Sequence, residues 1–252
     1  MKIGLTLYTL RQFVQKPADM METFTRVKKI GYNNVQLSAL GRVDTHYLKK
    51  MLDNAGLFVC ATHVSYDRLK NEFDKVIEEH EILRCPHIVI ASMPQDMRNE
   101  QGYKKFAAEC SEIGRRILSE GMDLSYHNHA FELMRYSGKT GLDIIYDESD
   151  KNCLFAEIDT YWIQYGGGDP SLWIKKMKDR IKVVHLKDMG IIDNTPAMFE
   201  VGEGNLNWQE IIAECKYSGV EWLVVEQDTC SGDPFDSVEI SFKNLLSMGL
   251  EA

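Results

Sequence analysis

Four short segments of the chain carry histidine, lysine or carboxylate side chains at alternate positions, the spacing that points side chains of an extended strand the same way. They are YHNHAFE (126–132), AEID (156–159), VHLKD (184–188) and VEQD (225–228). Imidazole nitrogens and carboxylate oxygens bind divalent metals, and the same groups serve as general acids and bases. The chemistry therefore depends on whether the fold brings these segments together.

The elements around these segments alternate regularly along the chain. Eight short runs rich in Val, Ile, Leu and aromatic residues are predicted strands: 3–8, 34–38, 57–64, 87–92, 123–129, 154–159, 182–187 and 222–228. Eight amphipathic segments follow them as predicted helices: 18–31, 44–56, 68–84, 100–121, 141–149, 169–180, 207–219 and 233–249. Eight such repeats in 252 residues predict one α/β domain, 1–252, folded as a single (β/α)8 TIM barrel.

Two helices illustrate the local signals. In 18–31, Met21, Phe24 and Val27 are expected to form the apolar face. In 44–56, Asp44 or Thr45 is the expected N-cap, and a glycine closes each helix. A doubly wound sheet is the competing architecture, but it would carry a Gly-rich phosphate loop after its first strand, where this chain has LYTLRQF.

In a barrel the active site lies at the C-terminal ends of the strands. The side chains expected there are Tyr8, His63, His127, His129, Glu157, Asp159, His185, Lys187, Glu226 and Asp228. So many buried carboxylates need a compensating positive charge. A single divalent ion supplies it, and mixed N/O ligands suit Mn²⁺, Co²⁺, Fe²⁺ or Zn²⁺, with Mg²⁺ also considered.

Individual roles stay open at this level. Asp159, His185 and Glu226 are the expected metal ligands, and His127 is either a fourth ligand or a lining residue. Tyr8 and His63 are substrate contacts or hydrogen-bonded lining. A further set can orient a ligand imidazole or contact substrate: His129 and Glu132.

Glu157 is either a proton-transfer group or the partner of Lys187 in a structural ion pair. Lys187 can instead neutralise an oxyanion during catalysis. Tyr8 and Trp162 can form an apolar wall for a sugar ring, and Asp228 is a further expected substrate contact. The segment 201–208 is expected to be the loop after the seventh strand, with Glu203 or Trp208 near the pocket.

Composition narrows the class of protein. The net charge of −9, with 44% hydrophobic and 27% charged residues, indicates a soluble globular domain and counts against nucleic-acid binding. The six cysteines form no CxxC pair, so we expect reduced thiols and a cytoplasmic location. The N-terminal residues lack the pattern of a signal peptide, so none is expected, and because no apolar run approaches about 20 residues, no membrane partner is expected. A homo-oligomer is compatible with the sequence.

The motifs AEIDTYW, VVHLKDM, VGEGNLNW and VVEQD, in this order, resemble the sugar phosphate isomerase/epimerase family with the xylose isomerase-like TIM barrel. YHNHAFE resembles the fifth-strand signature of one branch of it. The resemblance covers nearly the whole chain. It implies one divalent metal held by Glu, Asp, His and Glu from strands 5 to 8, as in ketose 3-epimerases. Asp159, His185 and Glu226 match three of these ligands, and the first Glu falls on His127.

This departure matters because the resemblance implies a proton shuttle between two metal-bound glutamates. A metal that chelates a ketone and its neighbouring hydroxyl acidifies the C–H between them and favours an enediolate. Glu226 is the expected base, while His127, His129 or Glu157 returns the proton or protonates a leaving hydroxyl. The predicted function is sugar isomerisation or epimerisation, with dehydration or elimination of a 3-keto-glycoside as the alternative.

Two other classes remain. An abasic-site DNA endonuclease shares this barrel, but the negative charge and the 7 histidines argue against it. A barrel that binds a small carbohydrate without catalysis is kept open by His127. The sequence shows no obvious basic cradle for a phosphate, which disfavours a phosphorylated sugar.

Overall fold

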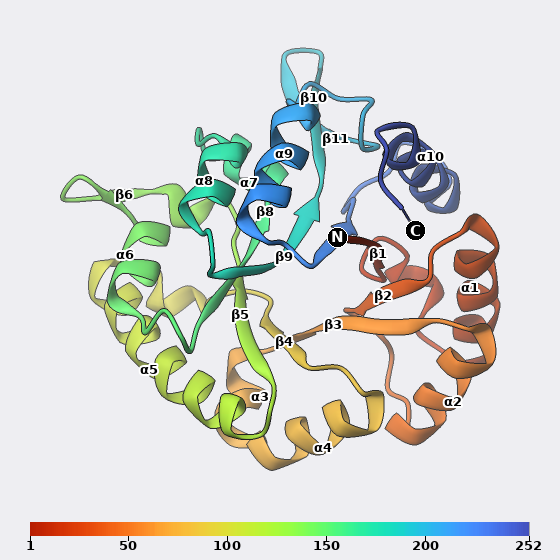
Figure 1. Cartoon of the computed structure of the whole chain (residues 1–252), viewed down its shortest axis with the longest axis horizontal. Coiled ribbons are helices and arrows are strands. Elements are labelled where there is room, and N and C mark those ends of the chain that lie inside the picture. Colours follow the sequence, from red (N-terminus) through yellow and green to blue (C-terminus); the bar gives the residue numbers. More distant parts are fainter. Residues whose placement is uncertain (252) are drawn as a thin grey trace.

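The eight predicted strands close into one parallel barrel in the computed structural model, which describes residues 1–251 (Figure 1). Around the barrel the strands follow the order β1-β12-β9-β8-β5-β4-β3-β2. They are β1 (Lys2–Thr6), β2 (Asn34–Leu37), β3 (Phe58–Val64), β4 (His87–Ile90), β5 (Asp123–His127), β8 (Phe155–Asp159), β9 (Ile181–Leu186) and β12 (Trp222–Val225). Most of their residues are buried, as expected for strands covered on both faces. The predicted (β/α)8 barrel is confirmed.

Ten α-helices occur in residues 1–251, and most of them surround the barrel (Figure 1). They are α1 (Pro17–Ile30), α2 (Thr45–Ala55), α3 (Tyr66–Asn71), α4 (Phe73–Leu83), α5 (Glu100–Ser119), α6 (Gly141–Glu148), α7 (Thr160–Tyr165), α8 (Pro170–Lys176), α9 (Trp208–Ser218) and α10 (Pro234–Ser247). The segment predicted as one helix over 68–84 is divided, because the chain leaves helical geometry at Glu72 between α3 and α4.

The caps and faces of two helices test the local predictions. Asp44 is the N-cap of α2, since its side chain accepts a hydrogen bond from the backbone N–H of Tyr47 at 2.9 Å. In α1 the predicted face was wrong by one residue: Met20 is buried and Met21 is half exposed. Met20, with the buried Phe24, follows the i, i+4 spacing of a helix face, and the chain starts the helix at Pro17.

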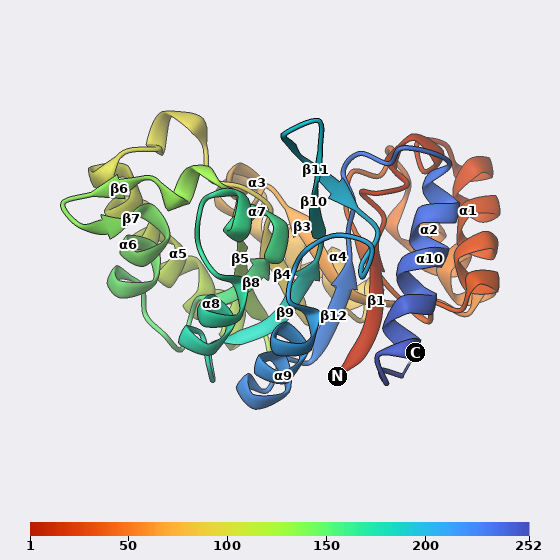
Figure 2. The same cartoon turned by 90° about the horizontal axis from the view of Figure 1, so that it is seen from above.

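Shorter elements lie in the loops at the ends of the barrel. Two antiparallel hairpins, which the sequence did not predict, are β6 (Arg135–Tyr136) with β7 (Lys139–Thr140), and β10 (Asp188–Ile192) with β11 (Thr195–Phe199). Single 3-10 turns are η1 (Arg11–Phe13), η2 (Gln95–Met97) and η3 (Phe131–Leu133). Figure 2 shows β10 and β11 rising on the side of the barrel opposite the N-terminus, where the strands end.

A small apolar cluster fills the inside of the barrel and limits how deep any pocket can reach. It consists of Cys60, Ala61, Val89, Val183 and Val224, all buried. The larger core lies between the strands and the helices. The histidines and carboxylates of the predicted site lie above this cluster, toward the C-terminal ends of the strands.

Several predicted site residues lie just past the strands instead of inside them. β1 ends at Thr6, β5 at His127, β9 at Leu186 and β12 at Val225. The residues concerned are Tyr8, His129, Lys187, Glu226 and Asp228. Their side chains are thus presented by the first residues of βα loops, the usual position of barrel active sites.

The cysteines and the helices bear on two further features of the chain. All six cysteines are free thiols, and five of them are buried. Among the helices within residues 1–251, none combines the length and apolar character that a membrane crossing requires.

Candidate functional site

Four predicted ligands meet at the mouth of the barrel. The side chains of His127, Asp159, His185 and Glu226 are buried, and one ligand atom of each lies within 4.8 Å of those of the others. Their strands β5, β8, β9 and β12 are consecutive in the barrel, and the register pairs Asp159 with His185. The order of the strands in the barrel therefore brings together four residues that are far apart in the sequence.

The separations within this cluster suit a single ion. Nε2 of His127 lies 3.3 Å from Oδ2 of Asp159 and 3.9 Å from Oε2 of Glu226. Nδ1 of His185 lies 2.9 Å from the same Glu226 oxygen and 4.0 Å from the same Asp159 oxygen. Ligand atoms about 2.0–2.2 Å from one metal lie roughly 3.0–3.5 Å apart. The donor set and its spacing fit a divalent metal.

Hydrogen bonds behind the cluster orient two of its members. Nδ1 of His127 lies 3.2 Å from the carbonyl oxygen of Ala91, which only accepts, so Nδ1 donates there and Nε2 points at the carboxylates of Asp159 and Glu226. Oδ1 of Asp159 accepts the backbone N–H of Trp162 at 2.9 Å and caps α7. The other oxygen of Asp159 is left for the cluster.

Glu157 lies one layer deeper than Asp159, because they are two residues apart on the same face of β8. Its Oε1 accepts from Nε2 of His63 at 2.8 Å and from Nε2 of His185 at 3.1 Å. Its Oε2 accepts from Nε2 of Gln36 at 2.9 Å. The carboxylate is fully occupied with holding these side chains.

Two expectations about Glu157 are therefore not met. It does not pair with Lys187, because Lys187 lies above the level of Asp159 while Glu157 lies below it. Glu157 is fully buried and does not line the pocket, so it is not placed to exchange a proton with a substrate.

Lys187 instead lies among three carboxylates. Its Nζ is 3.0 Å from Oδ2 of Asp159, 2.7 Å from Oε2 of Glu226 and 2.9 Å from Oδ1 of Asp228. Oδ2 of Asp159 and Oε2 of Glu226 are the same oxygens that face His127 and His185. The ammonium thus neutralises the acidic cluster, and it is 1% exposed.

These contacts set the charges of the site. Burial opposes charging of His185, but the carboxylates of Glu157 and Glu226 raise its pKa to about 10. Burial likewise opposes charging of Lys187, yet the three carboxylates around it hold its pKa above the usual value. Burial, with a smaller effect of the nearby imidazole, lowers the pKa of His129 to about 3. At neutral pH His129 is therefore an uncharged imidazole.

A pocket of about 160 Å³ opens directly beside the cluster. The predicted residues that line it are Tyr8, His63, His127, His129, Trp162, Lys187, Glu226 and Asp228. Ser38, Ala91 and Ser92 also line it, although the sequence analysis did not select them. They lie in the first turns after β2 and β4, so listing every strand end would have found them.

Glu132 was expected to contact substrate, and the structure places it elsewhere. It is fully buried, with one oxygen accepting from the hydroxyl of Tyr126 and the other from the backbone N–H of His129 at 2.9 Å. The turn η3 folds it back under the loop. Glu132 therefore fits the alternative reading, in which it orients residues of the YHNH segment.

The 201–208 segment also stays away from the pocket. Trp208 begins α9, and its Nε1 donates to Oδ2 of Asp188 at 2.6 Å. Glu203 accepts from Asn244 at 2.8 Å. The hairpin β10–β11 takes the place after β9 that this segment was expected to fill.

Gln36 was missed entirely by sequence reasoning. It is fully buried, its amide donates to Glu157, and its oxygen accepts from Nε2 of His185. A glutamine between the apolar residues of VQL in this buried strand is the signal that could have drawn attention to it, because a buried amide needs polar partners.

Comparison with known proteins supports the fold assignment. An L-ribulose 3-epimerase structure superposes with a TM-score of 0.74 at 16% identity, covering 99% of this chain and 95% of that one. A sugar phosphate isomerase/epimerase from Parabacteroides distasonis gives a TM-score of 0.80 at 24% identity, covering 97% of this chain and 93% of that one. At these identities the likeness shows the fold.

Curated sequences give a partial match. An inosose dehydratase from Clostridium beijerinckii is 27% identical over 161 residues, covering 55% of this chain and 52% of that protein. The chain therefore spans about half the length of the curated relatives it matches. Residues 24–245 match the family described as xylose isomerase-like TIM barrel. This match covers most of the chain and confirms the resemblance read from the motifs: the protein belongs to the xylose isomerase-like TIM barrel family.

Proposed function

We propose that the protein is a divalent-metal-dependent enzyme that enolises a small keto carbohydrate and completes the reaction by eliminating a neighbouring hydroxyl as water. The observation that carries this proposal is the cluster of His127, Asp159, His185 and Glu226, of which His127 and Glu226 line a 160 Å³ pocket. A divalent ion held by these four residues would polarise a ketone oxygen as a Lewis acid.

Glu226 is the base in this proposal. Its Oε2 faces His185 and Lys187, whereas Oε1 accepts no hydrogen bond from residues 1–251 and the side chain lines the pocket. Oε1 is therefore available to remove a proton from the carbon next to the ketone. Nζ of Lys187 lies 2.7 Å from Oε2, the other oxygen of the same carboxylate, and can stabilise the negative charge that develops on the substrate.

The other lining residues position the ring. Tyr8 and Trp162 offer aromatic surface to the apolar face of a sugar. The neutral His129 can hydrogen-bond a hydroxyl, since its Nδ1 is buried without a partner in the described part of the chain. None of these roles needs a charged imidazole.

Elimination fits this arrangement better than epimerisation does. Epimerisation needs a second proton-transfer group on the opposite face of the substrate. On the β5 side of the pocket both nitrogens of His127 are engaged, Glu157 lies below the pocket, and burial lowers the pKa of His129 to about 3, which makes it a weak base. In a syn elimination Glu226 alone suffices: it takes the C–H proton, the C=C bond forms, and the same carboxyl protonates the departing hydroxyl. The curated relatives named inosose dehydratase are consistent with this outcome.

Aldose–ketose isomerisation is the second candidate, because one carboxylate can also move a proton between adjacent carbons on a single face. The two are separated by following the Mn²⁺-loaded protein with an inosose, and with aldose–ketose pairs, by proton NMR in D₂O. Elimination yields an unsaturated product with loss of water, whereas isomerisation incorporates deuterium without loss of a hydroxyl. Glu226→Gln should abolish either reaction.

The remaining classes predict different results. A binding-only barrel would take up carbohydrate without turnover, and a DNA endonuclease would cleave an abasic duplex in a salt-dependent way. If the protein binds metal but converts no keto carbohydrate, the proposed reaction is wrong. If it binds no divalent metal, the metal-dependent function is wrong altogether.

A further inference from the structure

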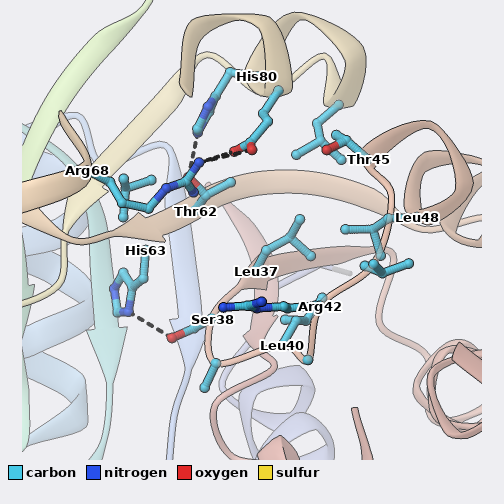
Figure 3. Close-up of a pocket in the computed structure, with 16 residues that line it drawn as sticks. Leu37, Ser38, Leu40, Arg42, Thr45, Leu48, Thr62, His63, Arg68 and His80 are labelled. Atoms are coloured by element: carbon cyan, nitrogen blue, oxygen red, sulfur yellow. Dashed lines mark hydrogen bonds and ion pairs between the residues drawn. The ribbon is translucent and has the colours of Figure 1, made fainter. Parts of the chain in front are cut away.

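A second cavity, of about 290 Å³, lies beside the pocket under the loop that joins β2 to α2 (Figure 3). Its lining comes from β2, β3, that loop and the helices α2, α3 and α4. Ser38 and His63 line both this cavity and the candidate pocket. Oγ of Ser38 lies 3.1 Å from Nδ1 of His63, so this pair forms a wall shared by the two spaces.

The cavity contains one uncompensated positive charge. Arg68, one of its two arginines, is neutralised by Glu79, whose carboxylate oxygens lie 2.9 and 3.0 Å from its Nη2. Arg42 is exposed and has no ion pair with any carboxylate of residues 1–251. Figure 3 shows the nitrogen end of Arg42 on the side of the cavity where Ser38 and His63 lie.

The loop that carries Arg42 is held in place from the β1 side. Nε2 of Gln15 donates to the carbonyl of Ala39 at 2.8 Å, and the N–H of Gly41 donates to the carbonyl of Val14 at 2.9 Å. Ala39 adopts a φ of 56°, and a Cβ on Gly41 would lie 2.0 Å from the carbonyl oxygen of Gln15. The backbone is therefore fixed in one conformation, which lowers the cost of ordering a ligand there.

We propose that this cavity is a subsite for an acidic substituent, a carboxylate or a phosphate, on the carbohydrate whose reacting carbons occupy the neighbouring pocket. Arg42 supplies the charge-assisted hydrogen bonds, which its planar guanidinium can form with two oxygens at once. The inference that the anion belongs to the reacting substrate rests on the proposed function. The sequence showed no basic cradle because a single arginine on a glycine-containing loop carries the charge.

The test compares matched ligands that differ in the acidic group alone. D-gluconate is compared with D-glucitol, and D-glucose 6-phosphate with D-glucose, by calorimetric titration of the full chain with and without Mn²⁺. We expect the wild-type protein to bind at least one anionic member about tenfold more tightly than its neutral partner. The two pairs distinguish a carboxylate site from a phosphate site.

Substitution then assigns the effect to Arg42. Arg42→Met should remove the preference for the anion, and Arg42→Lys should restore part of it. The control is Arg26→Met, on α1, where the guanidinium pairs with Asp233 at 3.7 Å. Because Arg42 is exposed, its variants should unfold at the wild-type temperature, which thermal unfolding checks.

Equal binding of both members of each pair, undetectable binding of all four ligands, or an anion preference that survives Arg42→Met overturns the subsite. Titration of Mn²⁺ alone is run in parallel. Absence of metal binding with an intact Arg42-dependent preference would reject the proposed function and leave the anion site standing. Metal binding without any anion preference would reject the anion subsite and leave the proposed function standing.

Discussion

Oε1 of Glu157 lies 3.1 Å from Nε2 of His185, while Nδ1 on the other side of that ring lies 2.9 Å from Oε2 of Glu226. Because Glu157 can only accept, Nε2 carries a proton, and the lone pair left when Nδ1 gives up its own proton would point at the acidic cluster, where a metal would bind. A carboxylate behind a metal-binding imidazole fixes its tautomer and raises its basicity. Glu157 is in this way a positioning residue for the site.

Replacing Glu157 with Gln tests this role. The amide keeps the shape but turns a donor toward the imidazoles, so His185 loses its fixed orientation. We expect the affinity for Mn²⁺ or Zn²⁺ to fall about 10- to 100-fold, measured by calorimetry. Glu109→Gln, which removes a surface carboxylate that pairs with Lys70 at 3.0 Å, is the matched control. Unchanged metal affinity in the Glu157 variant would show that the residue serves the fold alone.

Metal binding itself should stabilise the wild-type protein. An ion that binds only the folded state at a concentration 100 times its Kd adds about 2.7 kcal/mol to the free energy of unfolding. Thermal unfolding with EDTA and with added Mn²⁺ measures the shift, and Asp159→Asn should abolish it. His46→Ala, on the exposed face of α2, should leave the shift intact. If the unfolding temperature of the wild-type protein is the same with EDTA and with Mn²⁺, the assignment of these residues as metal ligands is contradicted.

Lys187 competes with a cation for the same two carboxylate oxygens. Lys187→Met leaves Asp159, Glu226 and Asp228 uncompensated, so the metal-free variant should lose about 3–5 kcal/mol of stability in urea unfolding. The same loss of positive charge should strengthen metal binding by about tenfold or more. Lys139→Met, which breaks the exposed pair with Asp147, should change neither quantity measurably. Weaker metal binding by Lys187→Met would show instead that the lysine organises the ligands.

The sequence predicted the barrel and the direction of the site residues, but it did not predict their depth. Glu157 and Asp159 alternate with an apolar residue and therefore share a face, which the pattern shows. Which of them joins the cluster with His127 and Glu226 depends on the register with β9, where Glu157 pairs with Val183 and Asp159 with His185. That register is set by packing across the whole barrel, so no local pattern reports it.

The other differences between the predicted and the observed positions of site residues lie in loops. Glu132 was placed near the substrate because it lies five residues past His127, but the turn η3 folds it underneath. Arg42 was not selected because an isolated arginine in a short loop is ordinary in sequence. Its significance comes from the neighbouring cavity, which is formed by residues far apart in the chain.

Glu132 gives the protein a specific pH dependence. Burial raises its pKa from 4.5 to about 7, although the hydroxyl of Tyr126 and the backbone N–H of His129 favour the charged form. The folded state therefore holds this proton more tightly than the unfolded chain does. The resulting stabilisation is complete below pH 4.5 and is lost as the pH rises toward 7.

Glu132→Gln should remove this contribution while keeping both hydrogen bonds, since the amide oxygen accepts from His129 and the hydroxyl of Tyr126 can accept from the amide. Urea unfolding between pH 4.5 and 8 measures the slope, and other groups that titrate in this range are common to both proteins. We expect the difference in stability between wild type and variant to change with pH up to about 7 and to stay constant above it. Glu148→Gln, at the exposed end of α6, is the matched control and should follow the wild-type slope. A difference between wild type and Glu132→Gln that is independent of pH would mean that Glu132 is already charged in the folded protein at pH 5, held so by its two donors.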